Sequence, residues 1–503
     1  MNPPVWFGSA AVVVGFVLLG VLAPGTTGEV FAALQRWLVN TFGWFYIGAV
    51  TVLLVWVLLL PIGPAGRIRL GPDDSRPEFR NLTWFSMLLA AGMGIGIVFF
   101  GVAEPLLHYA SPPGMAGQTP EARKAAFQYT FFHWGLHPWA VYCTLALPLA
   151  YFHFRKGLPL APRSLLYPVL KDRIHGWIGH LVDILCTCGT LFGVATSLGL
   201  GSIQINAGLN SLFGLPVGVP MQIGLIAVIT LIATVSVVTG LKGGIRALSS
   251  FNIGLAGLIL IFVLAVGPTI YLLDLFVTSL GSYLQQLPAL SLRIRPGADS
   301  GWQADWTLFY WSWWISWSPF VGVFVARISR GRTVREFVIA TLLVPSLAGF
   351  LWFSVVGGTG LNLLQAGNAA ILEAARDDVK GSSLFVVLEQ LPLGTVTTVA
   401  AIVLIFIFFV TSSDSGSFVD DMVTSGGDPN PPVPQRVFWA VSEGMVAAVL
   451  LLAGGLQSLR SASLTTGLPM AVFLLVAGFG IRRALRREVR ERRRQNEQAG
   501  DAS

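Results

Sequence analysis

Near-continuous apolar runs are the feature of this sequence that most restricts its fold. Each run is about 17–25 residues long, which suits a helix that crosses a hydrocarbon core of ~30 Å. A transmembrane β-barrel would instead show alternating segments of about ten residues. Of the 503 residues, 54% are hydrophobic and only 11% are charged, whereas soluble chains carry about 25% charged residues. The sequence therefore predicts an all-α, polytopic membrane protein and excludes a soluble enzyme, a disordered chain and a fibrous repeat.

Twelve transmembrane helices are predicted from these runs. The expected spans are residues 5–23, 44–62, 82–107, 127–152, 181–209, 220–240, 251–275, 305–326, 338–357, 396–412, 436–454 and 464–481. The first run lacks the basic start and the cleavage site of a signal peptide, so we interpret it as a membrane helix. The predicted domains are two peripheral helices (1–81), a first repeat (82–277), an amphipathic connector (278–304), a second repeat (305–481) and a basic cytoplasmic tail (482–503).

The basic residues indicate an orientation. Of the 32 Lys and Arg residues, 24 fall in the tail and in one set of alternating loops, and 8 fall on the other side. The positive-inside rule then places both termini in the cytoplasm. The net charge of +7 is thus a topology signal and does not indicate a nucleic-acid partner. The tail is interpreted either as a basic helix on anionic lipid or as a plain topology anchor.

The sequence shows no sign of enzyme chemistry or of a bound cofactor. Cys143, Cys186 and Cys188 lie in apolar runs, and their spacing suits neither a disulfide framework nor zinc. No Ser/His/Asp set or metal-ligand cluster emerges from the motifs. We therefore predict a protein that is not an enzyme.

Two spans contain residues that disfavour a regular helix. Gly92, Gly94 and Gly96 alternate within span three, where they favour local unwinding; close helix packing is the alternative. Span eight contains Pro319, which lacks a backbone donor. These spans open two sets of five helices (spans 3–7 and 8–12), and each set is predicted to begin with an interrupted helix. This is the pattern of inverted-repeat transporters, which place their sites near the bilayer midplane.

Aromatic residues cluster on spans four and eight. Helical-wheel angles place three aromatic residues of span four on one face, and the tryptophans of span eight fall within one arc. Converging indole faces bind a quaternary ammonium group through its charge, whereas freed backbone N–H groups at the glycines suit a carboxylate. Aromatic helix packing is the alternative. The candidate substrate-binding residues are Trp134, Trp139, Tyr142, Trp313, Trp314, Trp317, Gly92, Gly94 and Gly96.

The sequence closely resembles the betaine/choline/carnitine transporter family, and within it the sodium-coupled glycine betaine transporters. The matching stretches are residues 92–105, 132–139, 192–201, 206–210, 311–322, 326–333 and 409–416. The resemblance covers nearly the whole chain. It implies a twelve-helix inverted-repeat transporter, often a homotrimer, whose aromatic box consists of Trp134, Trp139, Tyr142 and Trp314. Trp313 and Trp317 are implied to line the site or its access path.

A sodium ion is the expected coupling ion. The hydroxyl groups of Thr411 and Ser412, with the carbonyl groups of Ala90, Met93 and Phe408, form a predicted oxygen cage that sodium-coupled members of the family share. Ordinary back-bonding of the hydroxyl groups to the preceding turn is the alternative.

A second sodium position is less complete in this sequence. Thr190 and Phe320 match the position in some family members, but Val194 stands where a second hydroxyl group is expected.

Gly96 indicates which substrate and coupling ion the protein uses, because proton-coupled choline transporters of the family tend to carry Asp at this position. The sequence therefore favours sodium and a zwitterion such as glycine betaine.

Two other functions remain open at this point. The first is proton-coupled or exchange transport of choline or carnitine, for which an intramembrane titratable group is needed. The second is a membrane sensor that binds its ligand without transport. The candidate titratable residues are Glu104, His133, His137, Asp183 and Asp414.

Overall fold

The computed structural model describes residues 1–92, 94–239, 242–294, 301–377, 381–428 and 430–501, and these residues are largely helical. The α-helices are α1 (Pro3–Leu22), α2 (Pro24–Leu59), α3 (Asn81–Gly92), α4 (Ile95–Ala110), α5 (Pro120–Trp134), α6 (Leu136–Ala150), α7 (Tyr167–Leu170), α8 (Trp177–Phe213), α9 (Val219–Thr239), α10 (Lys242–Val266), α11 (Thr269–Ser291), α12 (Gly301–Gln303), α13 (Phe309–Arg327), α14 (Val334–Trp352), α15 (Gly358–Gln365), α16 (Ala370–Arg376), α17 (Ser383–Glu389), α18 (Gly394–Thr424) and α19 (Val433–Asp501). An isolated bridge joins Arg69 to Thr333.

Long apolar helices confirm the prediction of a polytopic helical protein. The described part of the chain has eight helices long and apolar enough to cross a membrane, or nine if the bent pair α3–α4 forms one span. Part of the difference from twelve spans arises in α19, which merges two helices across non-helical residues at Gly454 and Gly455. Gly455 has a left-handed φ of 60°, which suits glycine. Twelve spans and the inverted repeat stay predictions.

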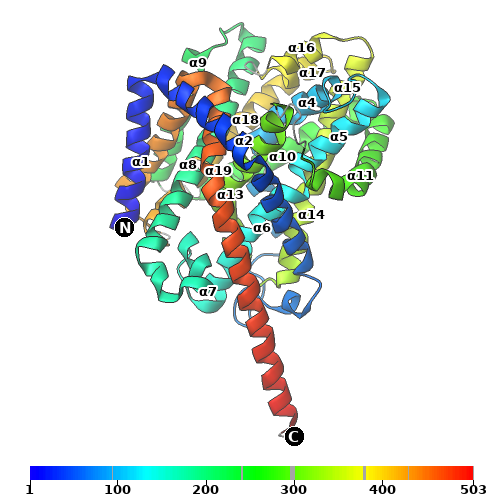
Figure 1. Cartoon of the computed structure of the whole chain (residues 1–503). Helices are drawn as coiled ribbons and strands as arrows, with labels where there is room; N and C mark the ends of the chain where they lie inside the picture. The colour runs from blue at the N-terminus through cyan, green and yellow to red at the C-terminus, as the bar shows by residue number, and fades with distance from the viewer. Residues whose placement is uncertain (93, 240–241, 295–300, 378–380, 429, 502–503) are drawn as a thin grey trace.

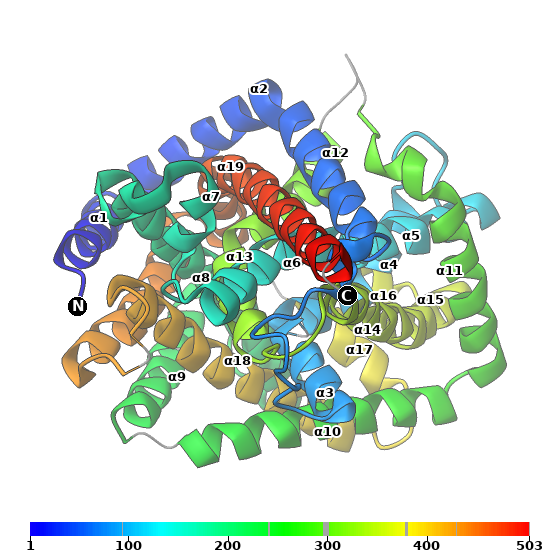
Figure 2. The same cartoon turned by 90° about the horizontal axis from the view of Figure 1, so that it is seen from below.

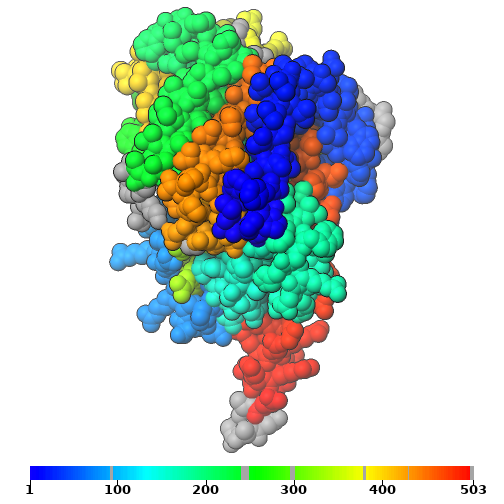
Figure 3. Space-filling view, turned by 90° about the vertical axis from the view of Figure 1, so that its left-hand side faces the viewer, coloured from blue at the N-terminus to red at the C-terminus, as the bar shows by residue number. Residues whose placement is uncertain are grey.

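The helices form a bundle from which the end of α19 projects (Figure 1). Helices α8, α18 and α19 pack on one another, and the view from below shows α10 and α11 along the periphery (Figure 2). Helix α1 lies against the first half of α19 (Figure 3). Leu231, Val235, Leu258 and Ile261 on α9 and α10 are exposed. Apolar side chains of this kind face lipid in a membrane protein.

The predicted interruption of span three is confirmed. Helices α3 and α4 meet at an angle of 68°. Gly94 has an extended conformation, with φ −107° and ψ −163°, and is the N-cap of α4 without a side-chain cap. The first N–H groups of a helix have no partner within the helix, so the N-terminus of α4 retains free donors. Met93 lies outside the described residues.

The predicted interruption of span eight is wrong. Helix α13 runs unbroken from Phe309 to Arg327, with Pro319 inside it. Proline leaves the carbonyl group four residues earlier without its usual donor. Here the Ser318 hydroxyl group donates to the Ile315 carbonyl oxygen at 2.7 Å, so the freed carbonyl is satisfied and the helix continues.

Span four contains a break that the sequence did not reveal. Helix α5 ends at Trp134 and α6 begins at Leu136, and Gly135 between them has φ −97° and ψ −129°. A Cβ atom on Gly135 would lie 2.5 Å from both the Phe131 carbonyl oxygen and the Phe350 ring. Glycine therefore permits a close approach at this point, and residues 134–142 do not form the continuous helix that the helical wheel requires.

The span predicted at 251–275 is also misplaced. Helix α10 ends at Val266, and α11 begins at Thr269. Gly267 and Pro268 separate the two helices, because proline supplies no backbone donor to continue a helix. The predicted connector at 278–304 is helical as far as Ser291, as part of α11.

Candidate substrate-binding site

The aromatic residues predicted from spans four and eight lie together in the centre of the protein. The ring centroids of Trp134 and Trp314 are 4.9 Å apart at an interplanar angle of 70°. Tyr142 lies 6.4 Å from Trp314 and 5.4 Å from Trp139. Trp314 also stacks on Trp313 at 4.8 Å. All five side chains are buried. The structure thus brings the rings together despite the break at residue 135.

Hydrogen bonds from the indole N–H groups fix three of the rings. Trp134 donates to Glu104 Oε2 at 2.7 Å, Trp314 donates to the His133 carbonyl oxygen at 3.0 Å, and Trp313 donates to the Gly193 carbonyl oxygen at 3.4 Å. Since the donors are engaged along the ring edges, these bonds hold the orientation of the aromatic faces. A cation binds to the face of an indole ring.

Two polar groups beside the rings have no protein partner. Tyr142 and Trp317 lie with their ring centroids 6.4 Å apart. The Tyr142 hydroxyl group and the Trp317 Nε1 atom are buried without a hydrogen bond. Buried donors without a partner are costly, so this part of the site is suited to a ligand that accepts hydrogen bonds.

Glycine brings the helix break close to the rings. A Cβ atom on Gly96 would lie 2.7 Å from Trp313 Cη2 and 2.9 Å from Trp134 Cη2. A Cβ atom on Gly94 would lie 3.3 Å from Trp317 Cη2. Gly92 is the last residue of α3. The free N–H groups at the start of α4 therefore lie near the aromatic rings.

Glu104 anchors this cluster. Its Oε2 atom accepts hydrogen bonds from Trp134 Nε1 and from the Tyr310 hydroxyl group, at 2.7 and 2.6 Å. Its Oε1 atom lies 2.7 Å from His133 Nδ1 and 3.3 Å from His108 Nε2. The sequence indicated Glu104 only as a titratable candidate and did not single out Tyr310. The signal for Tyr310 was present, because it precedes Trp314 by one helical turn.

The same cluster contains the atoms of a possible metal site. Ligand atoms of Glu104, His108 and His133 lie within 4.8 Å of one another, a proximity that the sequence motifs did not predict. However, Oε1 of Glu104 is already shared by the two imidazole rings, and His133 Nε2 lies 3.0 Å from Thr307 Oγ1. The geometry is that of a hydrogen-bonded anchor for Trp134.

The described residues of the predicted sodium cage lie on α3 and α18. The Thr411 hydroxyl group donates to the Ile407 carbonyl oxygen at 2.8 Å and lies 3.3 Å from the Phe408 carbonyl oxygen. Ser412 follows it on α18, and Ala90 lies near the end of α3. The back-bonding considered as the alternative is thus present, although a back-bonded hydroxyl oxygen retains lone pairs for a cation. Met93, the remaining member, is outside the described residues.

The second predicted sodium position lies along α8 and α13. Thr190 is buried, and its hydroxyl group has no hydrogen-bond partner. Phe320 is buried, with its ring centroid 5.3 Å from that of Trp317. Val194 is also buried, so the position of the missing hydroxyl is filled by apolar atoms.

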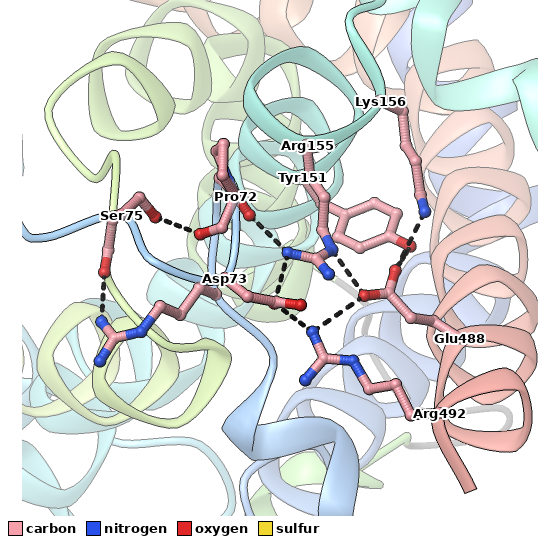
Figure 4. Close-up of polar contacts among 11 residues, drawn as sticks. Pro72, Asp73, Ser75, Tyr151, Arg155, Lys156, Glu488 and Arg492 are labelled. Carbon is pink, nitrogen blue, oxygen red and sulfur yellow. Dashed lines mark hydrogen bonds and ion pairs between the residues drawn. The ribbon is translucent and has the colours of Figure 1, made fainter. Parts of the chain in front are cut away.

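The basic end of α19 is held by a polar network (Figure 4). Glu488 accepts hydrogen bonds from the Tyr151 hydroxyl group and Arg155 Nε, both at 2.5 Å, and lies 3.1 Å from Lys156 Nζ. Asp73, in the loop before α3, pairs with Arg155 at 2.9 Å. Burial acts to raise the pKa of Glu488. The hydrogen bonds from Tyr151 and Lys156, together with the positive charges of Lys156 and Arg155, outweigh burial and hold this pKa below its ordinary value. The network therefore anchors the tail at Glu488, while the end of α19 projects beyond it (Figure 1).

A groove of about 970 Å³ runs between the end of α19 and the segment around α7. Its basic lining residues include Lys156, Lys171, Arg482, Arg486 and Arg490. A basic lining suits anionic lipid headgroups, and the contact of the tail with such lipid stays a prediction.

Comparison with known proteins decides the family. A sequence model of the betaine/carnitine/choline family transporters matches residues 4–490. The chain belongs to this family. It is 43% identical over 484 residues to the glycine betaine transporter OpuD of Bacillus subtilis, which covers 96% of this chain and 94% of the relative. It is 46% identical over 491 residues to an uncharacterised transporter of Mycobacterium tuberculosis, covering 96% of this chain and 82% of the relative.

The family membership confirms that the chain is a transporter and not an enzyme. Among solved structures, a Na⁺-coupled sialic acid symporter matches with a TM-score of 0.49 at 15% identity, covering 87% of each chain. A similarity at this level carries no argument about coupling or substrate.

Proposed function

We propose that this protein is a secondary active transporter that imports glycine betaine, or a related quaternary-ammonium compatible solute, by alternating access driven by the sodium gradient. The cluster of Trp134, Trp139, Tyr142 and Trp314 is the observation that carries the proposal. Its rings lie 4.9–6.4 Å apart in pairs and are buried. A quaternary ammonium group has no hydrogen-bond donors, so aromatic faces, at about 2 kcal/mol per desolvated contact, are suited to bind it.

A carboxylate on the substrate matches the polar groups next to the rings. Tyr142 and Trp317 each have a buried donor without a protein partner, and α4 begins nearby at Ile95 without a side-chain cap. Helix N-termini bind anions through their free N–H groups and the helix dipole. A zwitterion therefore satisfies both parts of the site, whereas choline lacks the anionic group.

Sodium is the proposed coupling ion. The Thr411 and Ser412 hydroxyl groups lie on α18. The neighbouring Phe409 and Ile95, at the start of α4, both lie beside Gly201 of α8, and α18 contacts α4. This contact brings α18 to the helix break, where Ala90 and Met93 are proposed to add carbonyl oxygens. Thr190 and Phe320 are proposed for a second sodium ion. Binding at the break couples the ion to the conformation of α3 and α4.

The proposed assembly is a homotrimer in the bacterial inner membrane, with both termini in the cytoplasm and with the tail against anionic lipid. The family membership and apolar helices support a multi-pass membrane transporter, and the excess of arginine in the tail supports the orientation. A channel or enzyme has no comparable support.

Uptake by proteoliposomes tests the proposal. We expect accumulation of labelled glycine betaine under an inward sodium gradient, with little accumulation when potassium replaces sodium. A panel of choline, carnitine and ectoine, each with and without sodium, measures substrate choice.

Three results would contradict parts of this function. Betaine uptake that persists without sodium but requires a pH gradient supports proton coupling. Choline or carnitine taken up in preference to betaine changes the substrate. Tight betaine binding without accumulation supports a membrane sensor.

A further inference from the structure

A buried carboxyl group lies between α18 and α19, outside the aromatic cluster. Glu443 on α19 is fully buried, and its Oε2 atom lies 3.2 Å from Ser413 Oγ and 3.1 Å from Ser417 Oγ on α18. Its Oε1 atom has no hydrogen-bond partner. A Cβ atom on Gly416 would lie 2.8 Å from this Oε1 atom and 2.9 Å from Val194 Cγ2 on α8. Three helices therefore meet around the carboxyl group.

The two serine hydroxyl groups do not supply enough hydrogen atoms for these contacts. Ser417 Oγ lies 2.8 Å from the Ser413 carbonyl oxygen and 3.1 Å from Glu443 Oε2. A hydroxyl group has one hydrogen atom, and a carbonyl oxygen only accepts. If the Ser417 hydroxyl group donates its hydrogen atom to the Ser413 carbonyl oxygen, Ser417 Oγ and Glu443 Oε2 lie 3.1 Å apart with no hydrogen atom between them, unless the carboxyl group is protonated. A proton on the carboxyl group converts this contact into a hydrogen bond from Glu443 to Ser417.

A second carboxyl group without a partner lies nearby. Asp420 is fully buried, and both of its carboxyl oxygens lack a hydrogen-bond partner. Asp420 follows Ser417 by three residues on α18, so the two side chains lie on the same face of the helix. An ionised carboxylate without a counter-charge is very costly in a membrane interior, and two such groups close together add mutual repulsion.

The surrounding basic groups are engaged by other acids. Arg436 pairs with Asp421 at 3.5 Å, and Arg163 pairs with Asp183 at 3.3 Å. Within the described part of the chain, no basic side chain forms an ion pair with Glu443 or Asp420. The titratable side chains on the adjoining turns of these three helices are Asp414, Asp420 and Asp421 on α18, Asp183, Cys186 and Cys188 on α8, and Arg436 on α19.

We propose that Glu443 forms a proton-binding site in which it carries a proton and donates it in a hydrogen bond to Ser417. A proton fits better than a metal ion, because hard metal ions such as Ca²⁺ take about six or more oxygen ligands. Four oxygen atoms come together at this site, the two carboxyl oxygens of Glu443 and the hydroxyl oxygens of Ser413 and Ser417, which is fewer than such an ion takes. Ser413 follows Ser412 directly on α18, so gain or loss of this proton acts on the helix that carries the proposed sodium ligands.

Infrared difference spectroscopy on the purified full-length protein tests the site without relying on transport. We expect the C=O stretching band of a protonated carboxyl group at neutral pH in wild type. This band is lost in Glu443→Gln, and it shifts in Ser417→Ala because the carboxyl group loses its acceptor. Asp420→Asn is expected to leave the Glu443 band in place, whether or not it removes another carboxyl band. Glu29→Gln is the matched control, since Glu29 is exposed on α2.

Uptake measured against pH at saturating sodium provides the second test. Above the pH at which Glu443 loses its proton, wild-type uptake is expected to fall by about tenfold per pH unit. Glu443→Gln resembles the protonated form and is expected to maintain uptake there.

The outcomes separate this proposal from the proposed function. A band unchanged by both Glu443→Gln and Ser417→Ala overturns the proton site, whatever the substrate is. The proton site is also overturned if wild type shows no protonated carboxyl band and uptake by Glu443→Gln no longer depends on sodium. That result would assign a sodium ion to Glu443 instead. Absence of betaine transport with the band and its shift intact contradicts only the proposed function. If Glu443→Gln does not fold, the band shift in Ser417→Ala still decides.

Discussion

Two membrane-spanning regions in which the sequence predicted an interruption differ in outcome, because residues 81–110 break and α13 does not. In residues 81–110, α3 and α4 meet at 68°, and Gly94 is extended. Helix α13 continues through Pro319. The proline leaves one carbonyl group without a donor, and the Ser318 hydroxyl group satisfies it at 2.7 Å. A single neighbouring side chain can repair a proline, because only one bond is missing.

Glycine acts differently, because it permits other groups to approach. The rings of Trp134 and Trp313 occupy the space that a Cβ atom on Gly96 would need, and the Phe350 ring does the same at Gly135. Both glycine breaks adjoin the aromatic cluster. Helix α13 is therefore the continuous helix that carries the indole rings, and α4 is the helix after the break whose free N–H groups lie near them.

Gly96→Ala is expected to have the largest effect on the broken region. The new Cβ atom would lie 2.7 Å from Trp313 and 2.9 Å from Trp134, so the rings must move. A displacement of about 1 Å in a binding site can reduce activity by about 100-fold, and we expect betaine uptake to fall by at least about tenfold. Gly48→Ala on α2 is the control, because a Cβ atom at Gly48 would have no neighbouring atom within 4 Å. Equal uptake by the two variants would show that the close approach at Gly96 is unimportant.

Trp314→Ala tests the continuous region. Its loss removes a ring that contacts Trp134 at 4.9 Å and Tyr142 at 6.4 Å, so the apparent KM for betaine is expected to rise at least about tenfold. The measurement is initial uptake against betaine concentration, with the fold checked by size-exclusion chromatography. Trp177→Ala, at an exposed tryptophan, is expected to match wild type. An unchanged KM for Trp314→Ala argues against the aromatic box.

The double variant Thr411→Ala/Ser412→Ala tests whether α18 binds sodium at the broken region. We expect the sodium concentration for half-maximal uptake to rise by about fivefold or more, since two oxygen ligands are lost. Thr234→Ala is the control, because Thr234 makes the same kind of back-bond, at 2.7 Å to Thr230, on α9. A sodium titration that matches wild type would leave back-bonding as the only role of Thr411.

The sequence predicted the membrane class, the break at Gly94 and the residues of the aromatic cluster, because apolar length, glycine spacing and tryptophan content are local signals. It did not predict the break at Gly135, which depends on Phe350 from α14 packing against that position. Neither did it predict that Glu104 would anchor Trp134, because that contact joins α4 to α5. The false break at Pro319 has a similar origin, since the repairing Ser318 was visible but its rotamer was not.

The smallest expected effect concerns that repair. Ser318→Ala leaves the Ile315 carbonyl oxygen without a donor and is expected to reduce stability by about 1–3 kcal/mol, the cost of an unsatisfied buried acceptor. Adding Pro319→Ala restores a backbone N–H group at the position that normally donates to this carbonyl. The double variant should therefore be more stable than Ser318→Ala alone, as measured by thermal unfolding in detergent. If the second substitution restores nothing, the hydroxyl group does not substitute for the missing backbone donor, and the continuity of α13 must depend instead on the packing of its aromatic rings.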